Sequence, residues 1–443
     1  MSALLAAVIS TISLIGTGGA PAAADTSTQL PISSYRDMAV DGIHRQVFIT
    51  DPFGGQVVVA DYSGQVVKQF SGAAGAWGLA LSEDSNTLYV ALRDAGAIAE
   101  IDTATLQETA RYDTGTGAGA YAGPTWLALA GGKVWFGYSV DTWSGDLGSL
   151  DLSGPEPVVT RAQAPRTFDG PPQIAAVPED PSTLVAADHF SDATLVRYDV
   201  SSGRAVEQVR SHGPGPYGCA SLNELALTPD ARQVVLACAS PYDHQAFRTA
   251  DLSHDGFYTT DAYPNAVAFA PDGTLALGSD ARHDDAWVYR PGYDAPLKAI
   301  DLGADRTVTG GLAWAPDHSR LFAVVTTYSS GPFTLKVLDD PAGQESTLLL
   351  DGPETAKRGQ QITITGTLTP TTWLGAGTTV SLRRSTFADP AGVSLGTATV
   401  SPDGTLAFTD RPRTTGTVWY EAKYAGDGWL SPAESVALVE VFD

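Results

Sequence analysis

Residues 76–115 read AWGLALSEDSNTLYVALRDAGAIAEIDTATLQETARYDTG, and this stretch predicts the fold of most of the chain. We expect strands over 77–81, 87–92, 97–101 and 108–112, because short apolar or alternating runs are separated there by turn-forming residues. Four short strands within about forty residues are typical of one blade of an antiparallel β-propeller.

The same unit recurs along the chain at a propeller-like period. Each expected first strand contains an alanine followed by an apolar residue, and consecutive alanines are 41 to 50 residues apart. The seven alanines are Ala39, Ala80, Ala128, Ala176, Ala226, Ala268 and Ala313. A small side chain suits the innermost strand, where neighbouring blades converge on the central axis. The sequence therefore predicts an all-β fold that begins with a seven-bladed β-propeller.

Aspartates mark the expected end of the third strand in most units. They are Asp61, Asp102, Asp151, Asp199, Asp251 and Asp339, and Arg290 replaces the aspartate in the sixth unit. An aspartate followed by Ser, Thr or Gly closes a tight turn by bonding nearby backbone. We therefore interpret these carboxylates as structural, and none of them is a candidate for catalysis.

Length and charge limit the classes of function. The chain has 443 residues, which is enough for a propeller and one further small module. Its 50 acidic and 26 basic residues give a net charge of −24, which repels phosphate backbones and anionic lipid. We expect a monomer with a solvated acidic surface, no nucleic-acid partner and no membrane insertion.

The N-terminus resembles an export signal. Residues 3–15 form an apolar run too short to span a bilayer, and Ala22-Ala23-Ala24 precedes Asp25 as an A-x-A cleavage site. No Lys or Arg precedes the apolar run, which departs from the usual signal pattern. We interpret residues 1–24 as a signal peptide and expect a secreted, extracellular protein.

The two cysteines fit that compartment. Cys219 precedes the first strand of the fifth unit, and Cys238 lies near the end of its second strand. In an antiparallel hairpin these places lie side by side, so a Cys219–Cys238 disulfide is expected in an oxidising environment. A pair of buried free thiols is the alternative.

Composition divides the chain into parts. The propeller is expected over 25–340, with residues near 28–34 supplying the missing outer strand of the last blade. A short linker over 341–345 leads to seven expected strands within 346–443, which is typical of an immunoglobulin-like sandwich.

Four stretches resemble known families. Leu88-Tyr89-Val90 and Ile101-Asp102-Thr103-Ala104-Thr105 resemble the YVTN-type propeller repeat, and 133–137 is similar to the related streptogramin-lyase and lactonase-like propellers. Residues 418–428 resemble bacterial Ig-like repeats of secreted proteins, which act as spacers or adhesion units. The resemblance implies a secreted propeller with an Ig-like domain, but such propellers include both non-enzymatic surface proteins and enzymes.

One face of the propeller is the expected binding surface. Turns between first and second strands are stereotyped, whereas loops between second and third strands are rich in aromatic, His and Asp residues. The predicted ligand-binding residues are Trp143, His189, Tyr242, His244 and His283. We expect a scaffold or binding protein, not an enzyme and without a cofactor, whose ligand is an extracellular glycan, small molecule or protein.

The alternative is a metal-assisted lactonase or lyase that uses the same face. His189, His244 and His283 occupy equivalent loops beside aspartates, and His with carboxylate can bind a divalent metal. Glu224 interrupts an apolar inner strand and is either a general base or a hydrogen-bonded channel carboxylate.

Overall fold

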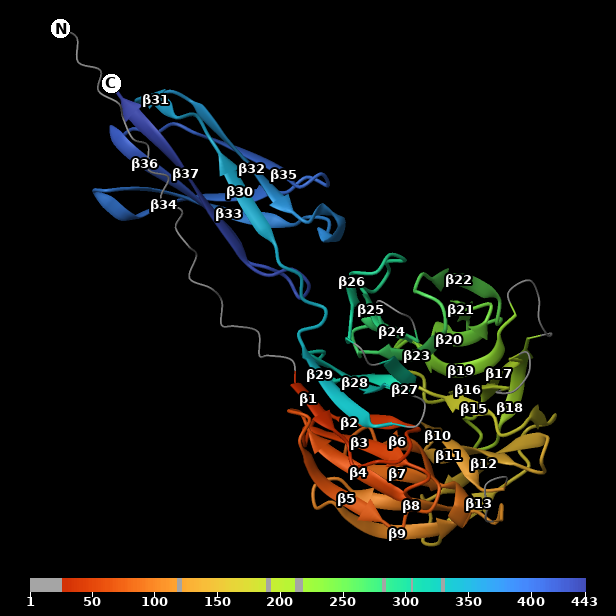
Figure 1. Cartoon of the computed structure of the whole chain (residues 1–443). Coiled ribbons are helices and arrows are strands. Elements are labelled where there is room, and N and C mark those ends of the chain that lie inside the picture. The colour runs from red at the N-terminus through yellow and green to blue at the C-terminus, as the bar shows by residue number, and fades with distance from the viewer. Residues whose placement is uncertain are drawn as a thin grey trace.

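The computed structural model describes residues 26–117, 122–188, 193–211, 218–280, 284–303, 306–327 and 331–443. The expected signal peptide over 1–24 lies outside the described residues. Within them, strands form a ring of sheets followed by an elongated two-sheet module, and the only helices are two short 3-10 turns (Figure 1). No helix in this part of the chain has the length and apolar character needed to cross a membrane.

The described part of the ring contains seven sheets, which we number in chain order. Sheet one contains β2 (Met38–Asp41), β3 (Gln46–Asp51), β4 (Gln56–Asp61) and β5 (Val66–Ser71), and sheet two contains β6 (Ala76–Leu81), β7 (Thr87–Leu92), β8 (Ala97–Asp102) and β9 (Gln107–Asp113). Sheet three contains β10 (Pro124–Ala130), β11 (Lys133–Ser139), β12 (Ser144–Asp151) and β13 (Val158–Thr160), with β14 (Phe168–Asp169) also paired to β12. Sheet four contains β15 (Gln173–Ala175), β16 (Thr183–Ala187), β17 (Leu195–Asp199) and β18 (Val206–Arg210). Sheet five contains β19 (Ala220–Leu227), β20 (Gln233–Ser240), β21 (His244–Arg248) and β22 (His254–Tyr258). Sheet six contains β23 (Pro264–Phe269), β24 (Leu275–Ser279), β25 (Ala286–Tyr289) and β26 (Lys298–Ile300). Sheet seven contains β27 (Arg306–Trp314), β28 (Arg320–Thr326), β29 (Phe333–Asp339) and β1 (Thr26–Gln29).

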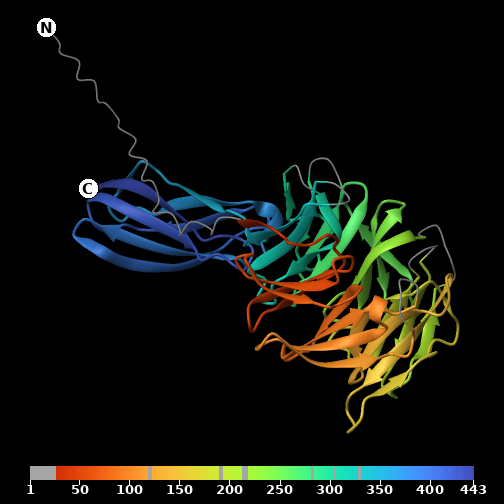
Figure 2. The ribbon, with the colours of Figure 1, turned by 60° about the horizontal axis from the view of Figure 1, so that its bottom comes forward.

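The sheets are arranged around a central axis (Figure 2). Their innermost strands contact one another in the cyclic order β2, β6, β10, β15, β19, β23, β27 and back to β2. Five of these inner strands carry a register shift against their partner, in β6, β10, β19, β23 and β27. Because a bulge interrupts the ladder, it leaves backbone groups available to a neighbouring sheet.

The ring is closed by its two sequence-distant ends. β1 pairs antiparallel with β29, with Thr26 opposite Val337 and Gln29 opposite Thr334, and β1 lies beside β29 in Figure 1. The expected closure by the N-terminal segment is confirmed, although the strand itself begins at Thr26. This pairing covers an edge of β29 that would otherwise expose unpaired backbone groups.

Four of the seven inner alanines lie on the wall of the central channel. Ala80, Ala128, Ala176 and Ala226 line a cavity of about 720 Å³ at the end of the ring that carries the turns between first and second strands. Small side chains at these positions therefore keep that end of the channel open.

Two further local expectations are confirmed. The turn aspartates accept hydrogen bonds from nearby backbone, as between Asp61 Oδ1 and the Ser63 amide at 2.8 Å and between Asp102 Oδ1 and the Thr105 amide at 2.7 Å. Cys219 and Cys238 form a disulfide with their Cα atoms 5.2 Å apart.

The C-terminal module consists of two sheets packed face to face. One sheet contains β30 (Thr347–Asp351), β32 (Ile362–Thr369) and β35 (Thr405–Asp410). The other contains β31 (Thr355–Lys357), β37 (Ala433–Phe442), β36 (Gly416–Tyr424), β33 (Thr379–Thr386) and β34 (Asp389–Thr399). Buried Ile364, Tyr420 and Val439 belong to a core shared by both sheets. Each of the seven strands expected from sequence is present, and β31 is an addition.

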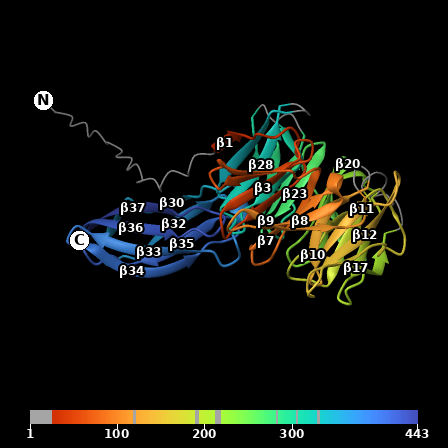
Figure 3. The same ribbon diagram turned by 90° about the horizontal axis from the view of Figure 1, so that it is seen from below.

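The junction between ring and module is ordered by specific contacts. The Gln344 amide donates to the Trp429 carbonyl at 2.8 Å, and the Ser431 amide donates to the Gln344 carbonyl at 2.9 Å. The Arg290 guanidinium of the ring lies over the Trp429 ring at 5.2 Å. The module extends from the side of the ring, with the C-terminus at its far end (Figure 3).

Candidate binding site at the channel mouth

A repeated position in the sequence surrounds one end of the channel. The residues three places before each inner alanine are Arg36, Trp77, Thr125, Gln173, Asn223, Asn265 and Gly310, which we call the mouth ring. They lie towards the end of the ring opposite the stereotyped turns. Arg36 precedes β2, and the other six are among the first five residues of innermost strands that run away from this face.

Three amides of the mouth ring join successive sheets. Gln173 Nε2 donates to the Asn223 carbonyl at 3.1 Å. Asn223 Nδ2 donates to the Pro264 carbonyl at 2.7 Å, and Asn265 Nδ2 donates to the Thr307 carbonyl at 2.7 Å. Sheets four to seven are thus connected through side chains at the channel mouth, so these amides have a structural role.

Residues 33–37, which we call the strap, connect the closing strand β1 to sheet one. Ser34 Oγ donates to Asp51 Oδ1 at 2.7 Å, which fixes the strap on sheet one. Tyr35 Oη donates to the Gly310 carbonyl of sheet seven at 2.5 Å. Asp37 Oδ2 accepts from the Leu79 amide of sheet two at 2.7 Å. The strap therefore contacts three sheets.

Arg36 of the strap stacks on two aromatic rings. Its guanidinium carbon lies 4.1 Å from the Trp126 ring centroid and 4.9 Å from that of Trp77. Nε and Nη2 are shielded from solvent and have no hydrogen-bond partner among the described residues. Enclosure lowers the pKa of Arg36 to about 10, against the opposing effects of the Asp37 and Glu224 charges.

Two carboxyl groups lie near this cation, and each accepts from backbone. Asp37 Oδ1 also accepts from the Met38 amide at 2.8 Å, and Glu224 Oε2 accepts from the Val267 amide at 2.6 Å. Burial raises the pKa of Asp37 to about 6 and the pKa of Glu224 to about 8. The geometry supports the interpretation of Glu224 as a hydrogen-bonded carboxyl group in the channel.

A cavity of about 810 Å³ opens at this end of the channel, and we call it the mouth cavity. Strap residues, the entry segments of β23 and β27, and the loops that follow β3, β24 and β28 line it. The lining includes Arg36, Phe53, Asn223, Tyr263, Asn265 and Arg306. The mouth cavity is thus on the face that sequence analysis predicts for binding.

Exposed aromatic residues stand at the rim of the mouth cavity. Phe53 is 82% exposed, and Tyr263 is 56% exposed. Tyr263 packs edge to face with Tyr242, itself 48% exposed, at a centroid distance of 4.9 Å. Both tyrosines have a left-handed backbone, with φ of 67° and 72°, a conformation that is unfavourable for bulky residues and is concentrated at functional sites.

The predicted binding residues are not all in one place. Tyr242 does not line the mouth cavity itself but packs against Tyr263, which does. Trp143, 84% exposed in the β11–β12 connection, does not line the mouth cavity. His189 and His283 lie outside the described residues. Among the described residues, no three His, Cys, Asp or Glu side chains are placed to hold a metal ion, so the metal-assisted alternative stays a prediction.

His244 is placed differently from a surface ligand. It is 0% exposed, its Nε2 lies 3.1 Å from the Ala266 carbonyl, and its Nδ1 lies 3.0 Å from Thr260 Oγ1. Burial lowers its pKa to about 3, so the ring is neutral at neutral pH. Sequence alone placed it in a loop, but it is the first residue of β21 and packs between sheets five and six.

We expect His244→Gln to cost stability while leaving ligand affinity unchanged. The loss of free energy of unfolding should be about 1–2 kcal/mol, because the Ala266 and Thr260 groups lose a well-placed partner. Urea unfolding measures the free energy of unfolding, and calorimetry measures the ligand affinity. If the variant has normal stability but no longer binds the ligand, His244 belongs to the binding site.

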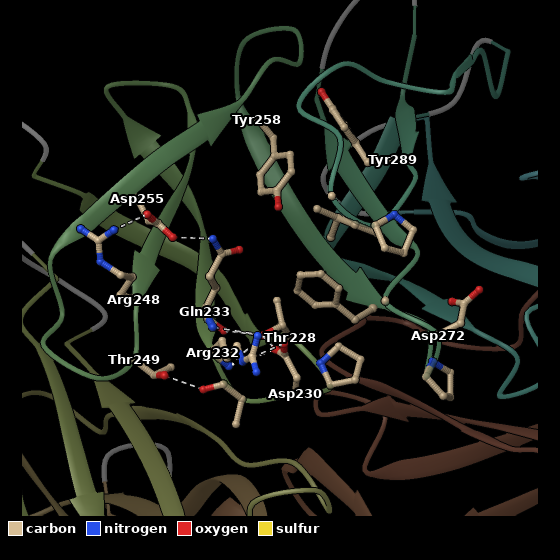
Figure 4. Close-up of a pocket in the computed structure, with 18 of the residues that line it drawn as sticks. Thr228, Asp230, Arg232, Gln233, Arg248, Thr249, Asp255, Tyr258, Asp272 and Tyr289 are labelled. Carbon is tan, nitrogen blue, oxygen red and sulfur yellow. Dashed lines mark hydrogen bonds and ion pairs between the residues drawn. The ribbon is translucent and has the colours of Figure 1, made fainter. Parts of the chain in front are cut away.

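A second hollow lies on the opposite face, between sheets five and six (Figure 4). This inter-sheet groove has a volume of about 690 Å³. Its polar side chains pair with each other: Asp255 accepts from Arg248 at 2.7 Å and from Gln233 at 2.6 Å. None of its lining residues has a buried unpartnered side-chain atom, whereas Arg36 and Asn265 of the mouth cavity do. The mouth cavity is therefore the stronger candidate.

Arg36, Asn223, Tyr263 and Asn265 are site residues that inspection of single loops misses. Their signal in the sequence is positional: three of them recur three residues before an inner alanine. Tyr263 lies two residues before Asn265, in the entry to β23.

Comparisons with known proteins support the architecture. No protein-family model and no curated protein matches the chain. Among solved structures, Kuenenia stuttgartiensis hydrazine synthase aligns with a TM-score of 0.52 and 16% identity, over 70% of this chain and 97% of that chain. The Cps50 (Swd1) β-propeller domain of Myceliophteria thermophila aligns with a TM-score of 0.53 and 13% identity, over 71% of this chain and 99% of that one. At these identities the likeness shows the fold alone, and the chain contains a β-propeller.

Proposed function

We propose that this protein is a secreted, YVTN-like seven-bladed β-propeller that binds an extracellular ligand at the mouth cavity. In this proposal, residues 25–340 are the propeller, 341–345 the linker, and 346–443 an Ig-like spacer or adhesion module. The ligand is a glycan, a small molecule or a protein. No enzymatic step and no cofactor is needed for this role.

The chemistry of the mouth cavity carries the proposal. Binding sites combine apolar and aromatic walls with a few convergent polar groups. Here Phe53 and Tyr263 provide exposed aromatic surface, while the buried Asn265 Oδ1 and the Arg36 guanidinium are available for directional contacts. The strained backbone of Tyr242 and Tyr263 costs stability. A role of the two side chains in binding explains why this strain is kept.

Export is supported by the covalent chemistry of sheet five. The Cys219–Cys238 disulfide is compatible with an oxidising, extracellular compartment. The apolar N-terminal run with its A-x-A site provides the route of export.

We expect a Tyr242→Ala, Tyr263→Ala double variant to lose ligand affinity by about tenfold or more, because two aromatic contacts disappear. The ligand is first found by screening glycans and metabolites against the wild-type protein. Affinity is then measured by calorimetry, and the melting temperature should stay near that of the wild type.

Phe257→Ala is the matched control, since Phe257 is 59% exposed on the outer strand β22 and should not affect binding. Trp143→Ala tests whether the site extends to sheet three. Unchanged ligand affinity in the tyrosine variant would contradict the proposal. A loss of affinity only in the Trp143 variant would show that the ligand binds near Trp143, elsewhere on the same face.

A further inference from the structure

We propose, on the basis of the function just described, that the mouth cavity binds a sugar-sized acidic ligand whose carboxylate pairs with Arg36. The proposal adds a ligand class to the site and assigns the charged contact to one residue. It follows from an unpaired cation, from the carboxylates around it and from the shape of the cavity.

Arg36 is enclosed without the partner that a guanidinium normally has. The indole rings of Trp77 and Trp126, which are nearly perpendicular to each other, both contact the guanidinium, and its Nε and Nη2 lack a hydrogen-bond partner among the described residues. Buried charges in proteins are usually paired and hydrogen-bonded, because desolvation of an ion is costly. Stacking on Trp77 and Trp126 offsets part of this cost but leaves the N–H groups unused.

The neighbouring charged groups do not supply the partner. A second cation, Arg93, lies 4.1 Å from the Trp77 centroid, and it is paired with Asp94 at 2.8 Å. The carboxyl groups of Asp37 and Glu224 accept from the Leu79 and Val267 amides. In a chain of net charge −24, the channel mouth thus holds an arginine without a hydrogen-bonded carboxylate among the described residues.

The surroundings favour a carboxylate over a phosphate. A planar guanidinium matches a planar carboxylate in a two-bond geometry. Asp37, which is ionised at neutral pH, would repel a dianion more strongly than a monoanion.

The cavity also favours a ligand with the body of a sugar. Its volume of about 810 Å³ lies within the range of pockets that enclose small-molecule ligands, so a sugar fits. Tyr263 at the rim offers an aromatic face, and Asn265 Oδ1 is an acceptor for a hydroxyl group.

The experiment compares D-glucuronate with D-glucose, which differ in the carboxylate. We expect calorimetry to give an affinity for D-glucuronate about tenfold or more above that for D-glucose, as for one charge-assisted contact. Tryptophan fluorescence should change with D-glucuronate only, because Trp77 and Trp126 cover the pairing residue.

Two variants assign the contact to Arg36. Arg36→Gln should abolish the preference for D-glucuronate, and Arg36→Lys, which keeps the charge but lacks the planar fork, should reduce it. If Arg36→Gln does not fold, the preference of the Arg36→Lys variant for D-glucuronate over D-glucose is the test of the contact. The matched control is Arg45→Gln on the opposite face, where Arg45 stacks on Tyr62 at 4.3 Å, and it should behave like the wild type.

Three results would overturn the inference: equal affinities for the two sugars, no binding of either sugar, or a preference that survives in both Arg36 variants. Equal affinities that fall together in the Tyr242→Ala, Tyr263→Ala variant would still support the proposed function. The proposed function fails separately, when that tyrosine variant keeps full affinity for a ligand found by screening.

Discussion

Replacing Glu224 with glutamine should stabilise the protein, and the gain should grow as the pH rises from about 4.5 to 8. Burial raises the pKa of Glu224 to about 8 from its ordinary value of 4.5. A carboxyl group with a raised pKa stabilises the fold while protonated, so its contribution is complete below the unfolded pKa and is lost as the pH rises through the folded one. Glutamine resembles the protonated carboxyl and can still accept from the Val267 amide.

The expected gain at pH 8 is a few kcal/mol, because one pKa unit corresponds to about 1.4 kcal/mol. Urea unfolding of wild type and variant at several pH values measures it. Glu83→Gln is the control, since Glu83 is exposed in the β6–β7 turn and relieves no buried charge. A gain that does not vary with pH, or a loss at pH 8, would contradict the placement of Glu224 in an enclosed channel.

Replacing both Cys219 and Cys238 with alanine should lower the free energy of unfolding by about 3 kcal/mol. The disulfide closes a loop with a sequence separation of 19, and in the chain-entropy model a loop of this length is worth about that amount. It ties the entry of β19 to β20, and β19 also carries Asn223 and Glu224 of the channel mouth.

Unfolding by urea with and without a thiol reductant supplies the control for this pair. Reductant should reproduce the loss in the wild type and have no further effect on the double variant. A loss below about 1 kcal/mol in both experiments would mean that the disulfide is not formed in the purified protein.

Sequence periodicity was sufficient to predict the strands of the ring. The strands expected over 77–81 and 87–92 correspond to β6 and β7, because the alternation of apolar residues and the turn chemistry agree locally. Closure by β1 was predictable too, since the last unit lacked its own fourth strand.

The binding site was less predictable, because it depends on contacts between units. His244 resembled the other loop histidines in sequence, and only the pairing of β21 shows that its ring is buried between two sheets. Arg36 stacks on residues 41 and 90 positions away, so no local pattern identifies the contact. The spacing of three residues before each inner alanine could have indicated the mouth ring.

The central claim is that the ligand binds at the channel mouth of the propeller. A structure of the protein with a ligand found by screening tests it most directly. The account predicts ligand density in the mouth cavity, beside Tyr263 and Asn265 and within reach of Arg36. Density in the inter-sheet groove beside Asp230 and Asp272, or on the C-terminal module alone, would contradict it.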